Sequence, residues 1–300
     1  MRIGFGLPVS GTWATPERLG RFAKAAEHQA YDSLWTFQRL FVGVDQAVDP
    51  VYRSVLDPLV ALGFAAACTE TVRLGVAVVN LPFVSPAYLA KQVGSLDVLS
   101  GGRVDLGLGT GWSEAEFAAT GASGERRAAR TREFVAVLRT LWRDEVSEFD
   151  GEFYTLPRGR MDPKPAREGG VPILLGGSVP AALSRAGEIA DGWVSRSAHD
   201  LTQIAKDVAL VRAGAEKAGR DPDEVRIVCR AVLFRPGREF LAGSWEKIRE
   251  DVAWLGTQGV TEIFYDLNFD PTIAGPDVDA AAAEDRALDI LHNLTPRGLS

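Results

Sequence analysis

Short apolar runs alternate with longer segments of helical periodicity along most of the chain. The first run, Arg2–Leu7, is followed by Thr15-Pro16-Glu17, where a threonine cap and a proline in the first turn favour the start of a helix. Val72–Val79 is apolar without interruption, as expected of a parallel strand buried on both faces. The pattern predicts strands at Arg2–Leu7, Ser33–Phe37, Val72–Val79, Val104–Leu108, Ile173–Leu175, Gly192–Val194, Val225–Phe234 and Val260–Tyr265.

Helical periodicity fills the intervals between these strands. Eight strand–helix steps close naturally into a (β/α)8 barrel, the TIM barrel of the α/β class. A doubly wound open sheet is the alternative, and it is disfavoured because no G-x-G-x-x-G motif follows the first strand. Without a repeat or a linker, we expect one domain over residues 1–300. Helices are predicted from Thr15, at Asp57–Cys68, from Ser85 to Gly101, and at Glu125–Trp142, Ser178–Ala190, Asp200–Gly219, Ser244–Leu255 and Ala280–Leu294.

The alternation is interrupted once, after the fourth strand. Val146–Phe149 and Glu152–Leu156 flank Asp150-Gly151, a dipeptide typical of a two-residue hairpin turn. A stretch rich in proline and arginine then runs on to Pro172. We therefore expect an insertion, at about residues 111–171, that carries a β-hairpin.

Composition and charge narrow the class of protein. The formal net charge of −7 gives no footprint for nucleic acid or an anionic membrane surface. No uncharged apolar run is long enough to cross a bilayer, and the amino terminus resembles a strand more than a secretion signal. Cys68 and Cys229 lie in separate apolar segments and are expected to be unpaired core thiols, consistent with a reducing cytoplasm. No metal-binding motif is present, so we expect a cytoplasmic protein that handles a small molecule without a metal.

Two glycine-rich segments follow predicted strands. Barrel enzymes place their active sites at the carboxyl ends of the strands, where both segments would lie. The sequence Leu174-Leu175-Gly176-Gly177-Ser178 precedes a helix start, so its free amides could bind a phosphate, with Ser178 as a plain helix cap as the structural alternative. In Gly107-Leu108-Gly109-Thr110-Gly111-Trp112, the hydroxyl of Thr110 could reach the same anion. Two such loops at one barrel mouth favour a phosphorylated cofactor.

Several further motifs carry a resemblance to a known family. In order, they are Tyr31-Asp32-Ser33-Leu34-Trp35, Val72-Arg73-Leu74-Gly75, Leu96-Asp97-Val98-Leu99-Ser100-Gly101-Gly102-Arg103-Val104, Gly109-Thr110-Gly111-Trp112, Phe149-Asp150-Gly151-Glu152-Phe153-Tyr154, Pro163-Lys164-Pro165 and Ala190-Asp191-Gly192-Trp193. Over at least Arg2 to Trp193, the chain resembles the luciferase-like monooxygenase superfamily, in its flavin- and coenzyme F420-dependent branch. The resemblance implies a barrel with an insertion after the fourth strand.

The resemblance also implies roles for individual residues. A non-prolyl cis peptide is expected between Ala77 and Val78, where it would press on the central ring of the cofactor. Gln38 is expected near the reactive edge of that ring and Asn80 near its polar rim. Thr110, Gly176 and Gly177 are expected at the cofactor phosphate, and Gly111 and Ser178 are further expected cofactor-binding residues. Coenzyme F420 is the cofactor implied, with FMN as the alternative.

The chain departs from well-known relatives where acid–base groups are common. Gln38-Arg39 replaces an acidic residue followed by histidine, and Trp112 replaces a glutamate of sugar-phosphate-oxidising relatives. Alcohol oxidation needs a resident base, so these departures favour reduction of an activated C=C, C=N or C=O bond. Arg39 is expected to orient the acceptor, unless it is a plain loop arginine. The proton would come from solvent or from His199, whose alternative role is in a helix cap; Glu114 and Glu116 are further candidates, or simply residues of a helix start.

Other functions remain open at this stage. With FMN in the same pocket, the chain would be a luciferase-like monooxygenase. A phosphate-binding barrel lyase or isomerase fits the glycine loops, but no lysine for a Schiff base stands at a predicted strand end. A non-catalytic cofactor-binding barrel also remains open because the usual acid–base pair is missing. The sequence leaves a homodimer open as well.

Overall fold

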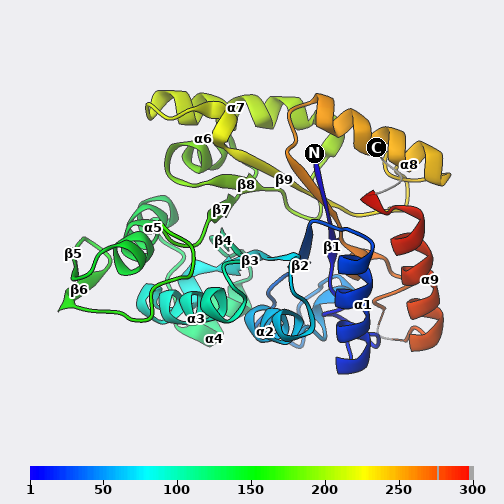
Figure 1. Ribbon diagram of the computed structural model, residues 1–300, viewed down its shortest axis with the longest axis horizontal. Coiled ribbons are helices and arrows are strands. Elements are labelled where there is room, and N and C mark those ends of the chain that lie inside the picture. The colour runs from blue at the N-terminus through cyan, green and yellow to red at the C-terminus, as the bar shows by residue number, and fades with distance from the viewer. Residues whose placement is uncertain (276, 297–300) are drawn as a thin grey trace.

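The computed structural model describes residues 1–275 and 277–296. Eight parallel strands form a closed barrel, with helices arranged around it (Figure 1). Going around the barrel, the order is β1, β10, β9, β8, β7, β4, β3 and β2. The predicted TIM barrel is therefore confirmed. The barrel strands are β1 (Arg2–Gly6), β2 (Ser33–Thr36), β3 (Arg73–Asn80), β4 (Val104–Gly109), β7 (Ile173–Gly176), β8 (Gly192–Val194), β9 (Arg226–Ala231) and β10 (Glu262–Tyr265).

Several of the helices around the barrel begin at side-chain caps where the sequence predicts them. Thr15 accepts a hydrogen bond from the backbone N–H of Arg18, and Asp57 accepts from those of Leu59 and Val60. These caps satisfy amides that have no partner inside the helix. The helices that follow barrel strands are α1 (Pro16–His28), α2 (Pro58–Cys68), α3 (Pro86–Leu99), α6 (Pro180–Ile189), α7 (Ile204–Lys217), α8 (Trp245–Thr257) and α9 (Ala280–Asn293).

The insertion lies between β4 and β7 and contains more structure than the sequence predicted. It holds α4 (Glu114–Thr120), α5 (Arg127–Arg143) and the hairpin of β5 (Ser147–Asp150) and β6 (Thr155–Gly159), which lies at the left edge of Figure 1. The hairpin is confirmed, but α4 was not predicted as an element.

The predicted two-residue turn at Asp150-Gly151 is wrong. The Glu133 carboxylate on α5 accepts hydrogen bonds from the backbone N–H groups of Glu152, Phe153 and Tyr154, at 2.8 to 3.2 Å. These amides therefore face the helix, and the second strand begins at Thr155 instead of Glu152. The predicted strand Val225–Phe234 is also shorter than expected, since β9 ends at Ala231 and Phe234 has a positive φ of 52°.

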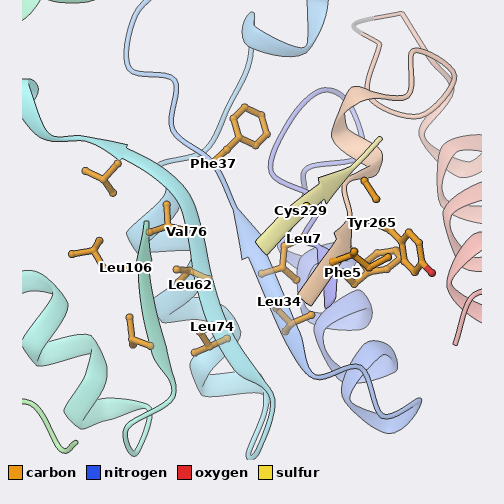
Figure 2. Packing of buried hydrophobic residues seen from close by; sticks show 14 of the residues in the cluster. Phe5, Leu7, Leu34, Phe37, Leu62, Leu74, Val76, Leu106, Cys229 and Tyr265 are labelled. Atoms are coloured by element: carbon orange, nitrogen blue, oxygen red, sulfur yellow. The ribbon is translucent and has the colours of Figure 1, made fainter. Parts of the chain in front are cut away.

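Alternate residues of the strands face the helices or the barrel interior. Leu34, Leu74, Val76 and Leu106, from β2, β3 and β4, pack with Leu62 of α2 in the main apolar core (Figure 2). The interior holds a second apolar cluster, in which the rings of Trp35 and Phe264 stack with their centroids 4.9 Å apart. This interior cluster includes Ala77 and contacts Val78, so it forms the floor beneath the barrel mouth.

Near the amino ends of the strands, the barrel interior is charged. Arg226 contacts Asp105 at 2.7 Å and Glu262 at 2.8 Å, and Arg73 also pairs with Asp105. Burial alone would raise the pKa of Asp105, but Arg226 and Arg73 outweigh it and lower that pKa. This network joins β3, β4, β9 and β10 across the lumen.

In the described part of the chain, no helix has both the length and the apolarity to cross a membrane, and no cluster of metal-ligating side chains occurs. Both cysteines are free thiols. Cys229 is buried, and burial raises the pKa of its thiol, whereas Cys68 is only half-buried.

Candidate active site

A cavity of about 450 Å³ opens at the carboxyl ends of the barrel strands. Its lining lacks the candidate proton donors His199, Glu114 and Glu116 but includes the other predicted site residues: Gln38, Arg39, Ala77, Val78, Asn80, Thr110, Gly111, Gly176, Gly177 and Ser178. These residues come from the ends of β2, β3, β4 and β7 and the loops that follow. The topology thus brings together positions that are up to 140 residues apart in the chain. We call this cavity the mouth pocket.

The floor of the mouth pocket is formed by the end of β3. The peptide bond between Ala77 and Val78 is cis, as the resemblance predicts, and the β3–β4 register shifts between Val76 and Val79. Glycines on β4 leave room for this irregular segment. A Cβ on Gly109 would lie 2.5 Å from Val78 Cγ2, and one on Gly107 would lie 2.2 Å from the Val76 carbonyl oxygen.

A chain of hydrogen bonds links three strand ends. Gln38 Oε1 accepts from the backbone N–H of Asn80 at 2.8 Å, and Asn80 Oδ1 accepts from the backbone N–H of Gly111 at 3.1 Å. The ends of β2, β3 and β4 are therefore held in register by two predicted site residues.

The second glycine loop leads from β7 into α6. Gly177 has a φ of +148°, and a Cβ there would lie 2.6 Å from the Ala182 Cβ, so this position favours glycine. The prediction that Ser178 begins the helix is wrong, because α6 begins at Pro180 with Val179 as its N-cap residue. No side chain caps α6. Pro180 has no N–H and the Ala182 N–H donates to the Val179 carbonyl at 2.8 Å, so the N–H groups of Gly177, Ser178 and Ala181 are the ones available to an anion.

Arg39 is buried and ion-paired, which excludes the alternative of a plain surface arginine. Its Nη1 lies 2.8 Å from Glu116 Oε2, and the two side chains are 4% and 1% exposed. The guanidinium carbon lies 4.3 Å from the ring centroid of Tyr52 and 4.4 Å from that of Trp112. Glu116 also accepts from the backbone N–H of Leu40 at 2.7 Å. Glu116 is thereby committed to structure, while Glu114 is exposed at the start of α4.

His199 lies outside the mouth pocket and lines a neighbouring cavity. Its Nε2 is 2.7 Å from Asp207 Oδ2 of α7, and its ring meets the Trp193 ring edge-on at 5.4 Å. Its Nδ1 is buried and has no hydrogen-bond partner among the described residues. The adjacent 3-10 turn, Leu201–Gln203, is capped by Asp200 and not by His199.

Arg230 on β9 is a site residue that the sequence interpretation missed. It lines the mouth pocket and is 7% exposed, and its guanidinium donates to the Ala77 carbonyl and lies 3.4 Å from the Asp266 carboxylate. Aromatic rings surround it, including those of Phe264 and Phe269. The available signal was an arginine close to the carboxyl end of an otherwise apolar strand.

The mouth pocket contains donors but few proton acceptors for acid–base work. Among the described residues that line it, there is no Asp, Glu, His or Lys. The polar side chains there are amides, hydroxyls and arginines, which bind and orient a ligand but do not accept a proton near neutral pH.

Comparisons with known proteins agree with this geometry. The model of the luciferase-like monooxygenase family matches residues 3–261. The chain belongs to this family. Two relatives are about one third identical to the chain over the segments that align.

One relative is the 5,10-methylenetetrahydromethanopterin reductase of Methanolobus tindarius, 34% identical over 216 residues, which cover 71% of this chain and 60% of the relative. Another is the F420-dependent hydroxymycolic acid dehydrogenase of Mycobacterium tuberculosis, 32% identical over 235 residues, which cover 77% of this chain and 62% of the relative. The chain therefore spans about three fifths of the length of both relatives. Among solved structures, a monooxygenase from Streptomyces bottropensis superposes with a TM-score of 0.78 at 22% identity, covering 99% of this chain and 100% of that one. That likeness establishes the shared fold.

Proposed function

We propose that this chain is an oxidoreductase that binds coenzyme F420 in the mouth pocket and transfers a hydride to a small organic acceptor with an activated C=C, C=N or C=O bond. The observation that carries the proposal is that one cavity has the Ala77–Val78 segment as its floor and the Gly176-Gly177-Ser178 loop, which leads into α6, in its lining. Relatives named as an F420-dependent dehydrogenase and as a reductase support the same class of reaction.

The residues of the pocket fit such a cofactor at both ends. At one end, the backbone N–H groups of Gly177 and Ser178, with the Thr110 hydroxyl, would hold the phosphate. At the other, the apolar Ala77–Val78 segment would support the face of the ring, and the amides of Gln38 and Asn80 would meet its polar edge. When bound, the reduced deazaflavin supplies a hydride, and the protein's part is to bind and orient the two reactants.

The side chains of the pocket favour reduction over alcohol oxidation. Oxidation of an alcohol needs a base near the reacting hydroxyl, and the described lining of the mouth pocket offers no carboxylate, imidazole or amine. Reduction needs a proton donor, which water can supply through the open mouth. His199 would take that role only if its ring turned away from Asp207.

Direct titration tests the cofactor. We expect quenching of cofactor fluorescence with F420 at lower concentrations than with FMN, and rapid oxidation of reduced F420 by an enone, imine or carbonyl acceptor from a panel. Tighter FMN binding with oxygen consumption would instead identify a monooxygenase. Binding without turnover of any acceptor would identify a cofactor-binding protein, and oxidation of a sugar phosphate alone would contradict the proposed direction.

We also propose that the chain forms a homodimer through α2 and α3, which lie side by side on the barrel (Figure 1). Helix α2 has no charged residue between Pro58 and Cys68, although its Val60 is 73% exposed and its Phe64 43% exposed. Tyr88 of α3 is 65% exposed. An apolar helix surface of this kind is typical of a face covered by a partner.

A further inference from the structure

Trp193 is a fully buried residue of β8 to which the proposed function gives no role. It belongs to Ala190-Asp191-Gly192-Trp193, one of the motifs that carry the family resemblance. Its side chain is part of the main apolar core and does not belong to the described lining of the mouth pocket. Packing alone does not require an indole at this position, because a buried indole N–H needs a hydrogen-bond acceptor.

The indole N–H of Trp193 reaches the loop between β7 and α6. Its Nε1 donates to the backbone carbonyl of Gly177 at 2.9 Å. Gly177 is the residue whose φ of +148° and close approach to Ala182 favour glycine. Since glycine is the residue with the greatest conformational freedom, this hydrogen bond fixes a carbonyl whose peptide could otherwise rotate.

Fixing this carbonyl also fixes the N–H of the next residue. The peptide between Gly177 and Ser178 is trans and planar, so its C=O and its N–H point in opposite directions. Because the carbonyl is turned toward the buried Trp193, the Ser178 N–H points away from the core. It donates to no group of the described residues, and Ser178 lines the mouth pocket. Trp193 thereby directs a backbone donor that a ligand in this pocket can use.

The Trp193 ring is held in place by His199. The two rings meet edge-on with their centroids 5.4 Å apart, and His199 Nε2 lies 2.7 Å from Asp207 Oδ2 of α7. The backbone carbonyl of His199 also accepts from Arg238 Nη1 at 3.0 Å. These contacts form a chain from α7 through the loop after β8 to the loop after β7.

We infer that Trp193 is a positioning residue for the cofactor phosphate: its indole N–H holds the Gly177 carbonyl and so aims the Ser178 N–H at the anion. This inference rests on the proposed function, since it needs a phosphate at this loop. A hydrogen bond weakens steeply as its N–H turns away from the acceptor. Loss of the Trp193 donor would therefore weaken binding of the phosphate but not of the ring at the other end of the pocket.

Two substitutions separate the N–H from the ring that carries it. Trp193→Phe keeps an aromatic ring and loses the donor. Trp193→His loses more of the ring but keeps a nitrogen, Nε2, at the ring position that corresponds to the indole nitrogen. Trp142→Phe is the matched control, because Trp142 of α5 is also buried and its Nε1 donates to the backbone carbonyl of Ala90 at 3.0 Å.

Fluorescence titration gives the affinity of each full-length variant for a deazaflavin nucleotide with a single phosphate and for the same deazaflavin without phosphate. The ratio of the two affinities is the phosphate preference, which a general loss of packing would not change. Urea unfolding checks that each variant is folded and measures how much stability it has lost.

Trp193→Phe is expected to lose about tenfold of the wild-type phosphate preference, the equivalent of one hydrogen bond to a charged group, while Trp193→His and Trp142→Phe retain it. An unchanged preference in Trp193→Phe, or an equal loss in Trp193→His or Trp142→Phe, would overturn the inference. Should one Trp193 variant not fold, the other decides by the same criteria. A wild type that binds both compounds equally, or neither, would overturn the proposed function instead.

Discussion

Gly177 and Val78 both line the mouth pocket, and the position of each depends on a glycine that has no side chain. The Gly177 conformation leaves no room for a side chain beside Ala182, and Val78 occupies space that a side chain on Gly109 would fill. Substituting Gly177 would therefore disturb the backbone as well as any bound phosphate. A charge placed at its exposed neighbour, Ser178, separates the two effects.

We expect Ser178→Asp to weaken F420 binding by about tenfold relative to Ser178→Asn, which has nearly the same shape without the charge. The added carboxylate would repel the cofactor phosphate but not destabilise α6, since a negative charge near a helix N-terminus is favourable. Thr110→Val should lose one hydrogen bond to a charged group, about 1.5–3 kcal/mol of binding free energy. Fluorescence titration measures both. Equal affinities for the Asp and Asn variants would place the phosphate elsewhere.

At the scale of single residues, the sequence predicted those pocket residues that belong to a recognisable motif or to the family resemblance. Gly177 was expected at the phosphate from its glycine-rich loop, Gln38 and Asn80 were expected at the cofactor from the family resemblance, and all three line the mouth pocket. The sequence interpretation missed Arg230 because it lies within a barrel strand. The spacing of residues along the chain does not show that its guanidinium contacts Asp266 and the Ala77 carbonyl. His199 was predicted from its place after a strand, but its partner Asp207 lies on the next helix.

Helix α4 joins the insertion to the loop after β2 through one buried ion pair. Glu116 binds both the Arg39 guanidinium and the backbone N–H of Leu40, so one buried carboxylate holds two groups of the loop against the helix. Tyr52 and Trp112 both contact that guanidinium, pack against each other with ring centroids 6.0 Å apart, and line the mouth pocket. The position of two pocket side chains therefore depends on this contact.

We expect Glu116→Gln to lower the free energy of unfolding by about 3 kcal/mol, because it leaves a buried arginine without its counter-charge. The matched control is Glu114→Gln, an exposed change on the same helix, which should shift stability by no more than about 0.5 kcal/mol. Urea unfolding measures both. A loss as small in Glu116→Gln as in the control would show that the pair does not anchor α4.

Elements of the insertion were harder to predict than those of the barrel. Each barrel strand is buried on both faces, so its apolar run is unmistakable, whereas α4 has seven residues and too few turns for a periodic signal. The hairpin turn was misplaced because its amides bind Glu133, about twenty residues earlier in the chain. The turn propensities of residues 150–154 do not account for a hydrogen-bond partner so far away in the chain.

For the whole barrel, the charged layer in the lumen makes stability depend on pH. The pKa of Asp105 is lower in the folded chain, because Arg226 and Arg73 outweigh its burial. A carboxyl of this kind stabilises the fold above its unfolded pKa of about 3.9, and the contribution is lost as pH falls through the folded value. Removing the charge leaves two arginines facing a buried neutral group.

We expect Asp105→Asn to lower the free energy of unfolding by about 3–5 kcal/mol at neutral pH and to flatten its decline below about pH 4. Asp150→Asn, on the exposed strand β5, serves as the control. Denaturant unfolding at a series of pH values measures the effect. An unchanged acid limb in Asp105→Asn would assign the pH dependence to other carboxyls.

The proposed dimer would form through α2, a helix of the barrel that has no charged side chain between Pro58 and Cys68. Burying Phe64 and Val60 of α2 against a second copy would remove apolar surface from water at about 25 cal/mol per Å². We therefore expect light scattering to report a dimer of the 32.3 kDa chain at micromolar concentration, and Phe64→Glu to convert it to a folded monomer. Val44→Lys alters an equally apolar but fully exposed loop residue and should leave the dimer intact. A wild-type monomer at every concentration would refute the dimer, and dissociation by Val44→Lys alone would move the interface to the loop after β2.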